Sequence, residues 1–209
     1  MFILGITGGI GTGKSTVLDI LRTEYSAYIL EADKVAHLLM MPGKSAFNEI
    51  VATFGEDILT EDGEIDRNIL GKKVMSESSS LEKLNSIVHP AVKEYIIQDI
   101  SEKRRVLLDQ SDNTEKQNLY VIEAALLIQD GYKEICDEIW SIITSEDIRI
   151  ERLIASRGYT EEKAKSFIKN QPSDDFYKSN SDRVIYNNGS TRELKIAIAK
   201  EIDSLSDIR

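Results

Sequence analysis

Cysteine, histidine and proline are scarce in this 209-residue chain, which contains one cysteine, two histidines and three prolines. The lone cysteine, Cys136, cannot form a disulfide within the chain, and no set of cysteines and histidines has the spacing of a zinc site. This thiol usage suits a reducing compartment, so we expect a cytoplasmic protein. We expect Cys136 itself to be a small buried apolar residue.

Long apolar runs and an excess of positive charge are also absent. No run approaches the roughly eighteen apolar residues that cross a bilayer, and the first residues lack the basic region of a signal peptide, so we expect no membrane partner. The net charge of −10 argues against a nucleic acid partner, because duplex binding relies on clustered lysine and arginine.

Glycine is concentrated near the amino terminus, where Gly8–Ser15 fits the pattern Gly, four residues, Gly, Lys, Ser or Thr. The backbone N–H groups of such loops wrap a polyphosphate, through turns that residues with a β-carbon tolerate poorly. Lys14 would add a full positive charge at the terminal phosphates, and Ser15 can place its hydroxyl on a nucleotide-bound Mg²⁺. The residues expected to bind the nucleotide are Gly11, Thr12, Gly13, Lys14, Ser15 and Thr16.

The segments on either side favour this interpretation over the alternative, a glycine-rich turn with a solvated lysine. Phe2–Ile6 is the continuous apolar run expected of a strand buried on both faces. Apolar residues at helical spacing follow the loop, namely Val17, Leu18, Ile20 and Leu21. Strand, loop and helix therefore occur in the order that phosphate binding requires.

The rest of the chain alternates between strands and helices, with one long helical interruption. Further strands are expected at residues 27–30, 119–122, 139–143 and 183–186, which predicts an α/β fold with a parallel, doubly wound sheet. From residue 41 to about residue 105 the pattern is helical, and we expect a separate helical lobe in which His89-Pro90 opens a helix. An exposed loop is expected around residues 110–113.

Two carboxylates follow expected strands, at positions where α/β proteins bind ligands. Asp33 comes shortly after the second strand and is a candidate for chemistry, but an aspartate there can equally be a helix N-cap. Glu123 comes directly after the strand at residues 119–122 and is a candidate to hold Mg²⁺ through water. The alternative for Glu123 is a salt bridge to a neighbouring helix.

Arginines mark the helix that starts near residue 146, where Ser145 is the expected cap and Gly158 the expected end. Arg149 and Arg152 are three residues apart and share a helix face, as two ligands of one phosphate would. A surface helix with salt bridges, for example to Glu151, would give the same pattern. The residues alone leave both interpretations open.

A series of motifs in this order resembles the dephospho-CoA kinase family over nearly the whole chain. The motifs are Ile6–Thr16, Glu31–Asp33, Phe54-Gly55, Ile65–Arg67, Ile87–Pro90, Glu123–Leu127, Arg152-Leu153 with Arg157, Gln171-Pro172, and Asp182 leading to Asn187–Gly189. Each motif is weak alone, but the series is specific to the family.

This resemblance implies an enzyme that transfers phosphate from ATP, with Mg²⁺, to the ribose 3′-hydroxyl of dephospho-CoA. It implies a three-layer P-loop kinase core at residues 1–40 and 119–209, with a helical lid at about 146–182, and a helical acceptor domain at 41–118. By the same match Asp33 would be the base, Lys14 would hold the ATP phosphates and Arg152 would contact phosphate. We expect a monomer or a weak homo-oligomer.

The chain departs from the family pattern at two places. The motif that begins at Glu123 lacks the usual proline and second carboxylate, and Tyr177 and Asn180 stand where the family usually has basic residues. Two other functions remain as alternatives: another small-molecule kinase, acting on a nucleoside or nucleotide, and a nucleotide-binding switch without catalysis.

Overall fold

The computed structural model describes residues 1–76, 78–109 and 119–206. The chain divides into two compact units, one formed by Met1–Ile29 with Glu115–Arg209 and the other by Leu30–Thr114. The loop expected around residues 110–113 lies outside the described residues. Within the described part of the chain, no helix combines the length and the apolar character that a membrane span needs.

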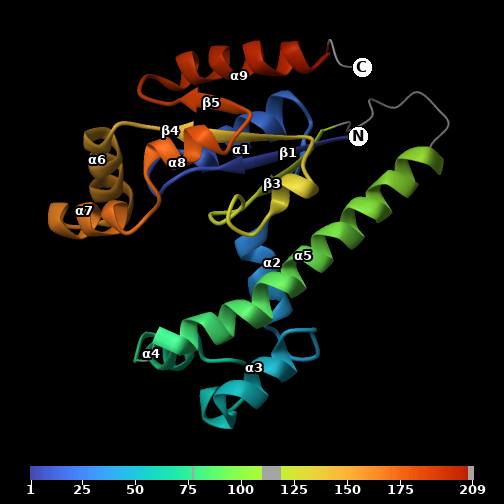
Figure 1. Cartoon of the computed structure of the whole chain (residues 1–209), viewed down its shortest axis with the longest axis vertical. Coiled ribbons are helices and arrows are strands. Elements are labelled where there is room, and N and C mark those ends of the chain that lie inside the picture. The colour runs from blue at the N-terminus through green and yellow to red at the C-terminus, as the bar shows by residue number, and fades with distance from the viewer. Residues whose placement is uncertain (77, 110–118, 207–209) are drawn as a thin grey trace. The chain divides into compact units, whose positions relative to one another are not determined.

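A five-stranded sheet with the order β2-β3-β1-β4-β5 organises the first unit (Figure 1). β1 pairs in parallel with both β3 and β4, and β4 pairs in parallel with β5. The strands are β1 (Phe2–Thr7), β2 (Tyr28–Glu31), β3 (Leu119–Glu123), β4 (Glu138–Ile143) and β5 (Arg183–Tyr186). The predicted α/β fold with a parallel sheet is confirmed.

Helices cover both faces of this sheet because successive side chains of a strand point to opposite sides. On one face, Trp140 and Ile142 of β4 join an apolar cluster with side chains of the first and last helices. On the other face, the Ser141 hydroxyl donates to the carbonyl of Tyr177, 3.4 Å away. The helices of this unit are α1 (Lys14–Glu24), α6 (Glu146–Arg157), α7 (Glu161–Lys169), α8 (Asp174–Ser179) and α9 (Thr191–Ser206), with a short 3-10 turn, η2 (Tyr132–Glu134).

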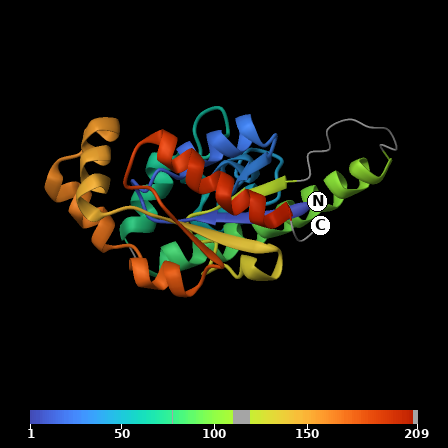
Figure 2. The same ribbon diagram turned by 90° about the horizontal axis from the view of Figure 1, so that it is seen from above.

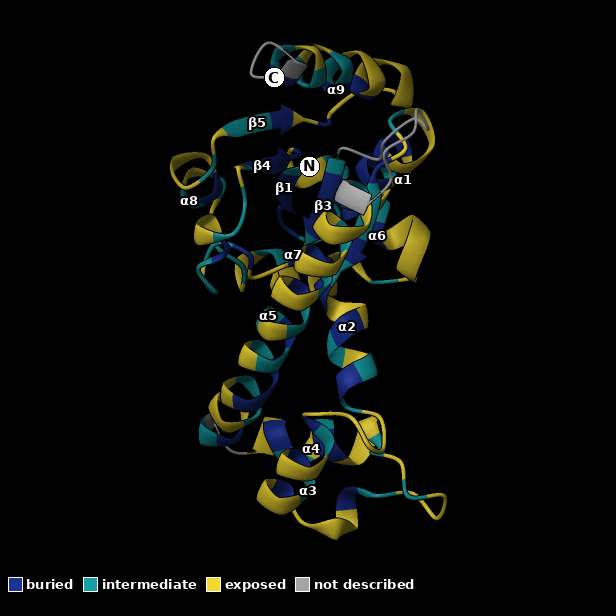
Figure 3. Cartoon of the chain, turned by 90° about the vertical axis from the view of Figure 1, so that its right-hand side faces the viewer, coloured by how far each residue is buried: buried dark blue, intermediate teal, exposed yellow. Residues whose placement is uncertain are grey.

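The α9 helix and the pair of α6 and α7 lie at different places around the sheet. α9 lies over the sheet, whereas α6 and α7 stand together at the end where β4 finishes (Figures 1 and 2). The strands are largely buried, and α9 carries both buried and exposed stripes (Figure 3). In such sheets ligands bind at the carboxyl ends of the strands.

After the end of β2, the described residues of the second unit are mainly helical, with one short bridge between Leu59 and Ile65. That bridge flanks a turn around residues 60–63. The longest helix, α5, packs against α2, α3 and α4. The elements are α2 (Ala32–Leu39), α3 (Phe47–Phe54), η1 (Glu56–Ile58), α4 (Arg67–Ser76) and α5 (Ser78–Asp109).

The expectation that His89-Pro90 opens a helix is wrong, because Pro90 lies inside α5. Proline lacks an N–H group and so removes one hydrogen bond from a helix interior. Tertiary packing outweighs this loss, since buried apolar side chains continue along one face of α5 on both sides of the proline. They are Ile87, Val88, Val92, Ile96 and Ile100.

The end of α6 at Gly158 is as expected, and α7 begins with a side-chain cap. Gly158 ends α6 in the left-handed conformation with φ 63°, and Thr160 caps α7 by accepting the N–H of Lys163 at 3.2 Å. The exception is Ser145, which occupies the N-cap position of α6 but makes no capping hydrogen bond with its side chain. Its own N–H instead donates to the Asn188 side chain at 2.9 Å.

A charged network around Arg183 joins β4, β5 and α9. Arg183 donates to both carboxylate oxygens of Glu138, at 2.8 and 3.0 Å, and to Glu201 at 2.6 Å. Burial alone raises the pKa of Glu138, but hydrogen bonds from Arg183 and Trp140 outweigh it and hold this pKa below its ordinary value of 4.5. The stabilisation is therefore present above about pH 4.5 and is lost as the pH falls through the lowered value.

We expect Arg183→Met to lower the free energy of unfolding at pH 7 by about 1–3 kcal/mol, because Glu138 loses the partner of its half-buried charge. Urea unfolding followed by circular dichroism measures this change. The difference from the wild type should shrink in acid, as Glu138 becomes protonated. A suitable control is Lys165→Met, which removes the exposed Lys165–Glu161 pair on α7 and should change the stability much less, because water and salt screen an exposed pair. Equal losses for both variants would contradict the prediction.

Candidate functional site

The loop between β1 and α1 has the backbone conformation that its glycines allow. Gly8, Gly11 and Gly13 have φ angles of 142°, 77° and 89°, which residues with a β-carbon rarely adopt. Gly13 is also the N-cap of α1, and a β-carbon there would overlap the side-chain nitrogen of Asn187. The first-turn N–H groups of α1 therefore open onto the loop, as an anion site at a helix N-terminus requires.

Lys14 is the first residue of α1, and its ammonium group lies over the loop. It donates to the Gly8 carbonyl at 2.9 Å and lies 3.6 Å from a carboxylate oxygen of Glu123, the last residue of β3. The side chains of Lys14 and Glu123 are only 17% and 13% exposed. A salt bridge to a neighbouring helix was one of the two expected roles of Glu123, and the structure contains this ion pair.

The carbonyl of Thr12 fixes the loop to three other elements. It accepts hydrogen bonds from the Thr144 hydroxyl at 3.0 Å, the Asn187 amide at 2.8 Å and Arg152 at 3.3 Å. Arg152 also donates to the Asn187 carbonyl at 3.0 Å. The structure thus brings Arg152 of α6, which the sequence singled out, directly against the loop that contains Gly11–Thr16.

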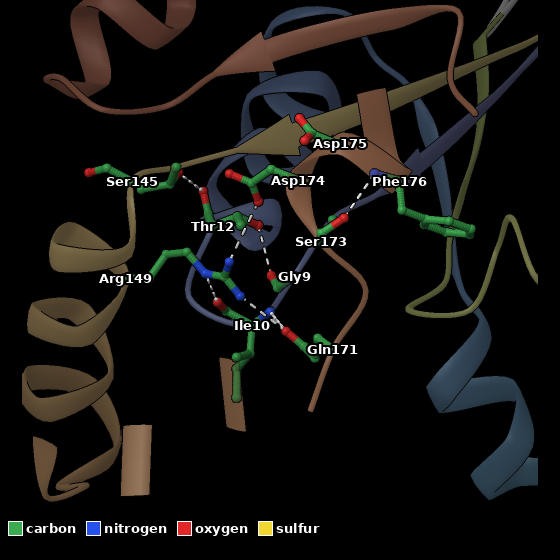
Figure 4. Close-up of polar contacts among 12 residues, drawn as sticks. Gly9, Ile10, Thr12, Ser145, Arg149, Gln171, Ser173, Asp174, Asp175 and Phe176 are labelled. Carbon is green, nitrogen blue, oxygen red and sulfur yellow. Dashed lines mark hydrogen bonds and ion pairs between the residues drawn. The ribbon is translucent and has the colours of Figure 1, made fainter. Parts of the chain in front are cut away.

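Arg149 lies on α6. It is not a surface residue that pairs with Glu151, which was one of the two interpretations of its spacing. It is 5% exposed, and it donates through Nε to the Ile10 carbonyl at 2.8 Å and through Nη2 to the Gln171 side chain at 3.1 Å (Figure 4). Ile10 also contributes to this contact, and the sequence reasoning gave it no role. The feature of the sequence that could have indicated this role is an apolar residue inside a glycine-rich loop.

Tyr177 and Asn180, which stand where the family usually has basic residues, are uncharged, and Lys178 between them pairs with Asp175 at 3.6 Å. Tyr177 is 2% exposed, and burial raises the pKa of its hydroxyl, while the Arg149 charge opposes that shift. Asn180 donates to the Phe176 carbonyl at 2.8 Å and so closes the end of α8. Both side chains have structural partners.

Ser15 and Thr16 follow Lys14 in the first turn of α1, and Ser15 is exposed. Among the described residues, no group of three or more His, Cys, Asp or Glu side chains is arranged to hold a metal ion. Two side-chain oxygen donors near the loop are the Ser15 hydroxyl and the Glu123 carboxylate, which pairs with Lys14. Oxygen donors of this kind suit Mg²⁺, which keeps several waters and takes further ligands from phosphates.

Asp33 lies in the second unit, as an exposed residue in the first turn of α2. The N-cap of α2 is Glu31, whose carboxylate pairs with Lys34 at 2.8 Å. Asp33 is therefore not the N-cap of this helix, and that interpretation is wrong. Its expected role as a base remains a prediction.

We expect Gly13→Ala to weaken the binding of ATP at least tenfold, because alanine is strained at φ 89° and its methyl group would displace Asn187 from the Thr12 carbonyl. Titration calorimetry with a non-hydrolysable ATP analogue measures the change. Gly63→Ala is a matched control, since Gly63 has φ 78° in an exposed turn and a β-carbon there meets nothing within 4 Å. Unchanged nucleotide affinity in Gly13→Ala would contradict this account of the loop.

Comparisons with known proteins identify relatives that match nearly the whole chain. A family model described as dephospho-CoA kinase matches residues 2–193. Dephospho-CoA kinases of Geobacillus kaustophilus and Moorella thermoacetica are 36% and 32% identical to this chain, over 97% and 95% of it and 97% and 89% of their own lengths.

Solved structures share the fold. TT1252 from Thermus thermophilus has a TM-score of 0.76 at 24% identity, and dephospho-CoA kinase from Campylobacter jejuni has 0.69 at 22%; each comparison covers 98% of this chain and 97% of the other. A shikimate kinase from Acinetobacter baumannii reaches 0.51 at 15% identity, over 98% of this chain and 94% of its own. With a family model matched across residues 2–193, this chain belongs to the dephospho-CoA kinase family.

Proposed function

We propose that this chain transfers the γ-phosphate of ATP to the ribose 3′-hydroxyl of dephospho-CoA, giving coenzyme A and ADP. It is then a phosphotransferase with an alcohol acceptor that acts in coenzyme A biosynthesis. The observation that carries this function is the family match over residues 2–193. The loop geometry supports it independently, because a glycine-rich turn that opens a helix next to a lysine suits a polyphosphate.

In this proposal the loop residues Gly11–Thr16 bind the ATP phosphates, and Lys14 and Arg152 neutralise charge that develops during transfer. Phosphoryl transfer needs little covalent chemistry from a protein, so positioning and electrostatic stabilisation carry most of the rate. Lys14 already lies over the loop, and Arg152 is held against Thr12. Both cations are partly buried, which strengthens their interactions with phosphate.

We assign Mg²⁺ to the Ser15 hydroxyl, with Glu123 acting through water. The support is that Ser15 is exposed beside Lys14 and that the Glu123 carboxylate lies 3.6 Å from the same lysine. A bound Mg²⁺ would neutralise phosphate charge and orient the transferred group.

Asp33 is assigned as the base that accepts the proton of the acceptor hydroxyl. The support is its position two residues after β2 ends, where ligands bind in α/β sheets, together with its exposure and the family motif that contains it. A positioned general base contributes about 10²- to 10⁴-fold to a rate.

One region is assigned to binding of the acceptor, and another is assigned to a lid. Residues 41–118 form the acceptor domain, and residues of about 146–182 form the lid, which excludes water and limits wasteful hydrolysis of ATP. The support for the lid is that its residues Arg149, Arg152 and Gln171 hydrogen-bond to the phosphate loop. We place the enzyme in the cytoplasm because its single cysteine cannot form a disulfide within the chain, which suits a reducing compartment.

An acceptor assay tests the function directly. Purified protein with Mg-ATP should release ADP steadily when dephospho-CoA is added, and at least a hundredfold more slowly with adenosine or AMP. A coupled ADP assay, with mass spectrometry of the product, makes the comparison. Preference for adenosine or AMP would favour another small-molecule kinase, and ADP release that does not depend on any acceptor would rule out this transfer.

We expect Asp33→Asn to lower kcat by about 10²-fold or more while the affinity for ATP is retained, because the amide cannot accept the proton. Steady-state kinetics and titration calorimetry separate the two effects. Asp62→Asn is the matched control, since Asp62 is an exposed aspartate in the turn of the same unit. Lys14→Met should differ from both by weakening ATP binding and turnover together. Near-normal turnover in Asp33→Asn would remove the assigned base.

A further inference from the structure

Arg149 is a buried arginine whose guanidinium group faces main-chain atoms of the phosphate loop instead of solvent. Its Nε donates to the Ile10 carbonyl at 2.8 Å, and its Nη2 donates to the Gln171 side-chain oxygen at 3.1 Å. Asp174, the first residue of α8, lies 3.8 Å from Nη1 (Figure 4). Taking a charge out of water is costly, so this group is retained only with such partners.

The peptide groups of Ile10 are held from both sides. The Gln171 oxygen that accepts from Arg149 also accepts the N–H of Ile10 at 2.7 Å, so Ile10, Arg149 and Gln171 form a closed triangle, here called the Ile10 clamp. The Ile10 side chain packs in addition against Ile150, Leu153 and Ala164 of α6 and α7. Both its backbone polar groups and its side chain thus contact the α6–α8 region.

Gly9 leaves the space that the clamp needs. A β-carbon at this position would overlap the guanidinium of Arg149 and lie 3.0 Å from the Gln171 side-chain oxygen. The φ angle of Gly9 does not lie in the left-handed region that favours glycine. A residue without a side chain is needed here because Arg149 and Gln171 approach its backbone closely.

The clamp also separates the N–H group that binds protein from those that are assigned to the nucleotide. The N–H of Ile10 is donated to Gln171, so it does not point to a phosphate, whereas the residues assigned to the nucleotide begin at Gly11. Ile10 is therefore the fixed point before these residues. A displacement of about 1 Å at a reacting group can cost a hundredfold in rate, so an anchor next to the cradle has a functional value.

We propose that Arg149 is a positioning residue for ATP: through the Ile10 clamp it fixes the start of the phosphate loop and couples the loop to the α6–α8 region. Arg149 does not contact phosphate in this proposal. Its spacing to Arg152 had suggested that the two arginines bind one phosphate together. The inference rests on the proposed use of ATP. It adds a residue whose effect is confined to the nucleotide side of the reaction.

The test is a double-mutant cycle of Arg149→Met and Gln171→Leu. Each single variant should raise the KM for ATP and the dissociation constant of a non-hydrolysable ATP analogue about tenfold, with the KM for dephospho-CoA unchanged. The double variant should be no worse than the weaker-binding single variant, because each change alone already opens the triangle of Ile10, Arg149 and Gln171. Additive effects, or unchanged affinity for the analogue, would overturn the clamp.

Two further variants separate the clamp from charge and from general damage. Arg149→Lys keeps the charge but not the planar fork that reaches Ile10 and Gln171 together, so it should bind the analogue as weakly as Arg149→Met. Full rescue by lysine would show that only charge matters and would overturn the proposal. Arg192→Met, an exposed arginine of α9, should bind as the wild type does.

Thermal unfolding of every variant identifies loss of fold. If Arg149→Met does not fold, Gln171→Leu alone decides, because it opens the same clamp by removing the acceptor of the Ile10 N–H. A wild-type protein that fails to bind the ATP analogue would refute the proposed function. A wild type that binds, with a Gln171→Leu variant that binds equally well, would refute only the clamp.

Discussion

The hydrogen bonds to the Thr12 carbonyl are the interaction on which the rest of the site depends. Three donors from separate parts of the chain, Thr144, Arg152 and Asn187, meet at this one oxygen. They join the loop to the ends of β4 and β5 and to α6. A glycine-rich loop has high conformational entropy when it is free, so its shape has to come from such external contacts. The parallel sheet provides them by bringing its strand ends to one edge.

Much of the fold was predictable because it is encoded locally. Continuous apolar runs gave the buried strands, and the order of strand, glycine-rich loop and helix gave β1 and α1. The family was predictable from a series of short motifs in order, and the match over residues 2–193 confirms it. The error at Pro90 arose because a local rule about proline was outweighed by packing along α5, which neighbouring residues do not reveal.

The site was predictable in its composition but not in its contacts. Lys14 and Arg152 were identified from motifs, and both lie at the loop, but the carbonyls that they bind could not be derived from spacing. Arg149 shows the limit most clearly. Its helical spacing to Arg152 suggested a shared phosphate or a solvated face, whereas the fold buries it against Ile10. Burial of this charge depends in part on Ile10, which is 139 residues away in sequence.

The space at Gly9 has a consequence for how this loop can change. The general phosphate-loop pattern accepts any residue at this position, so a designer who reads only the pattern would treat it as free to vary. In this chain a methyl group there would meet the guanidinium of Arg149. Residues 9 and 149 therefore form one unit for protein engineering: a larger side chain in the loop becomes admissible only after the arginine on α6 has been shortened.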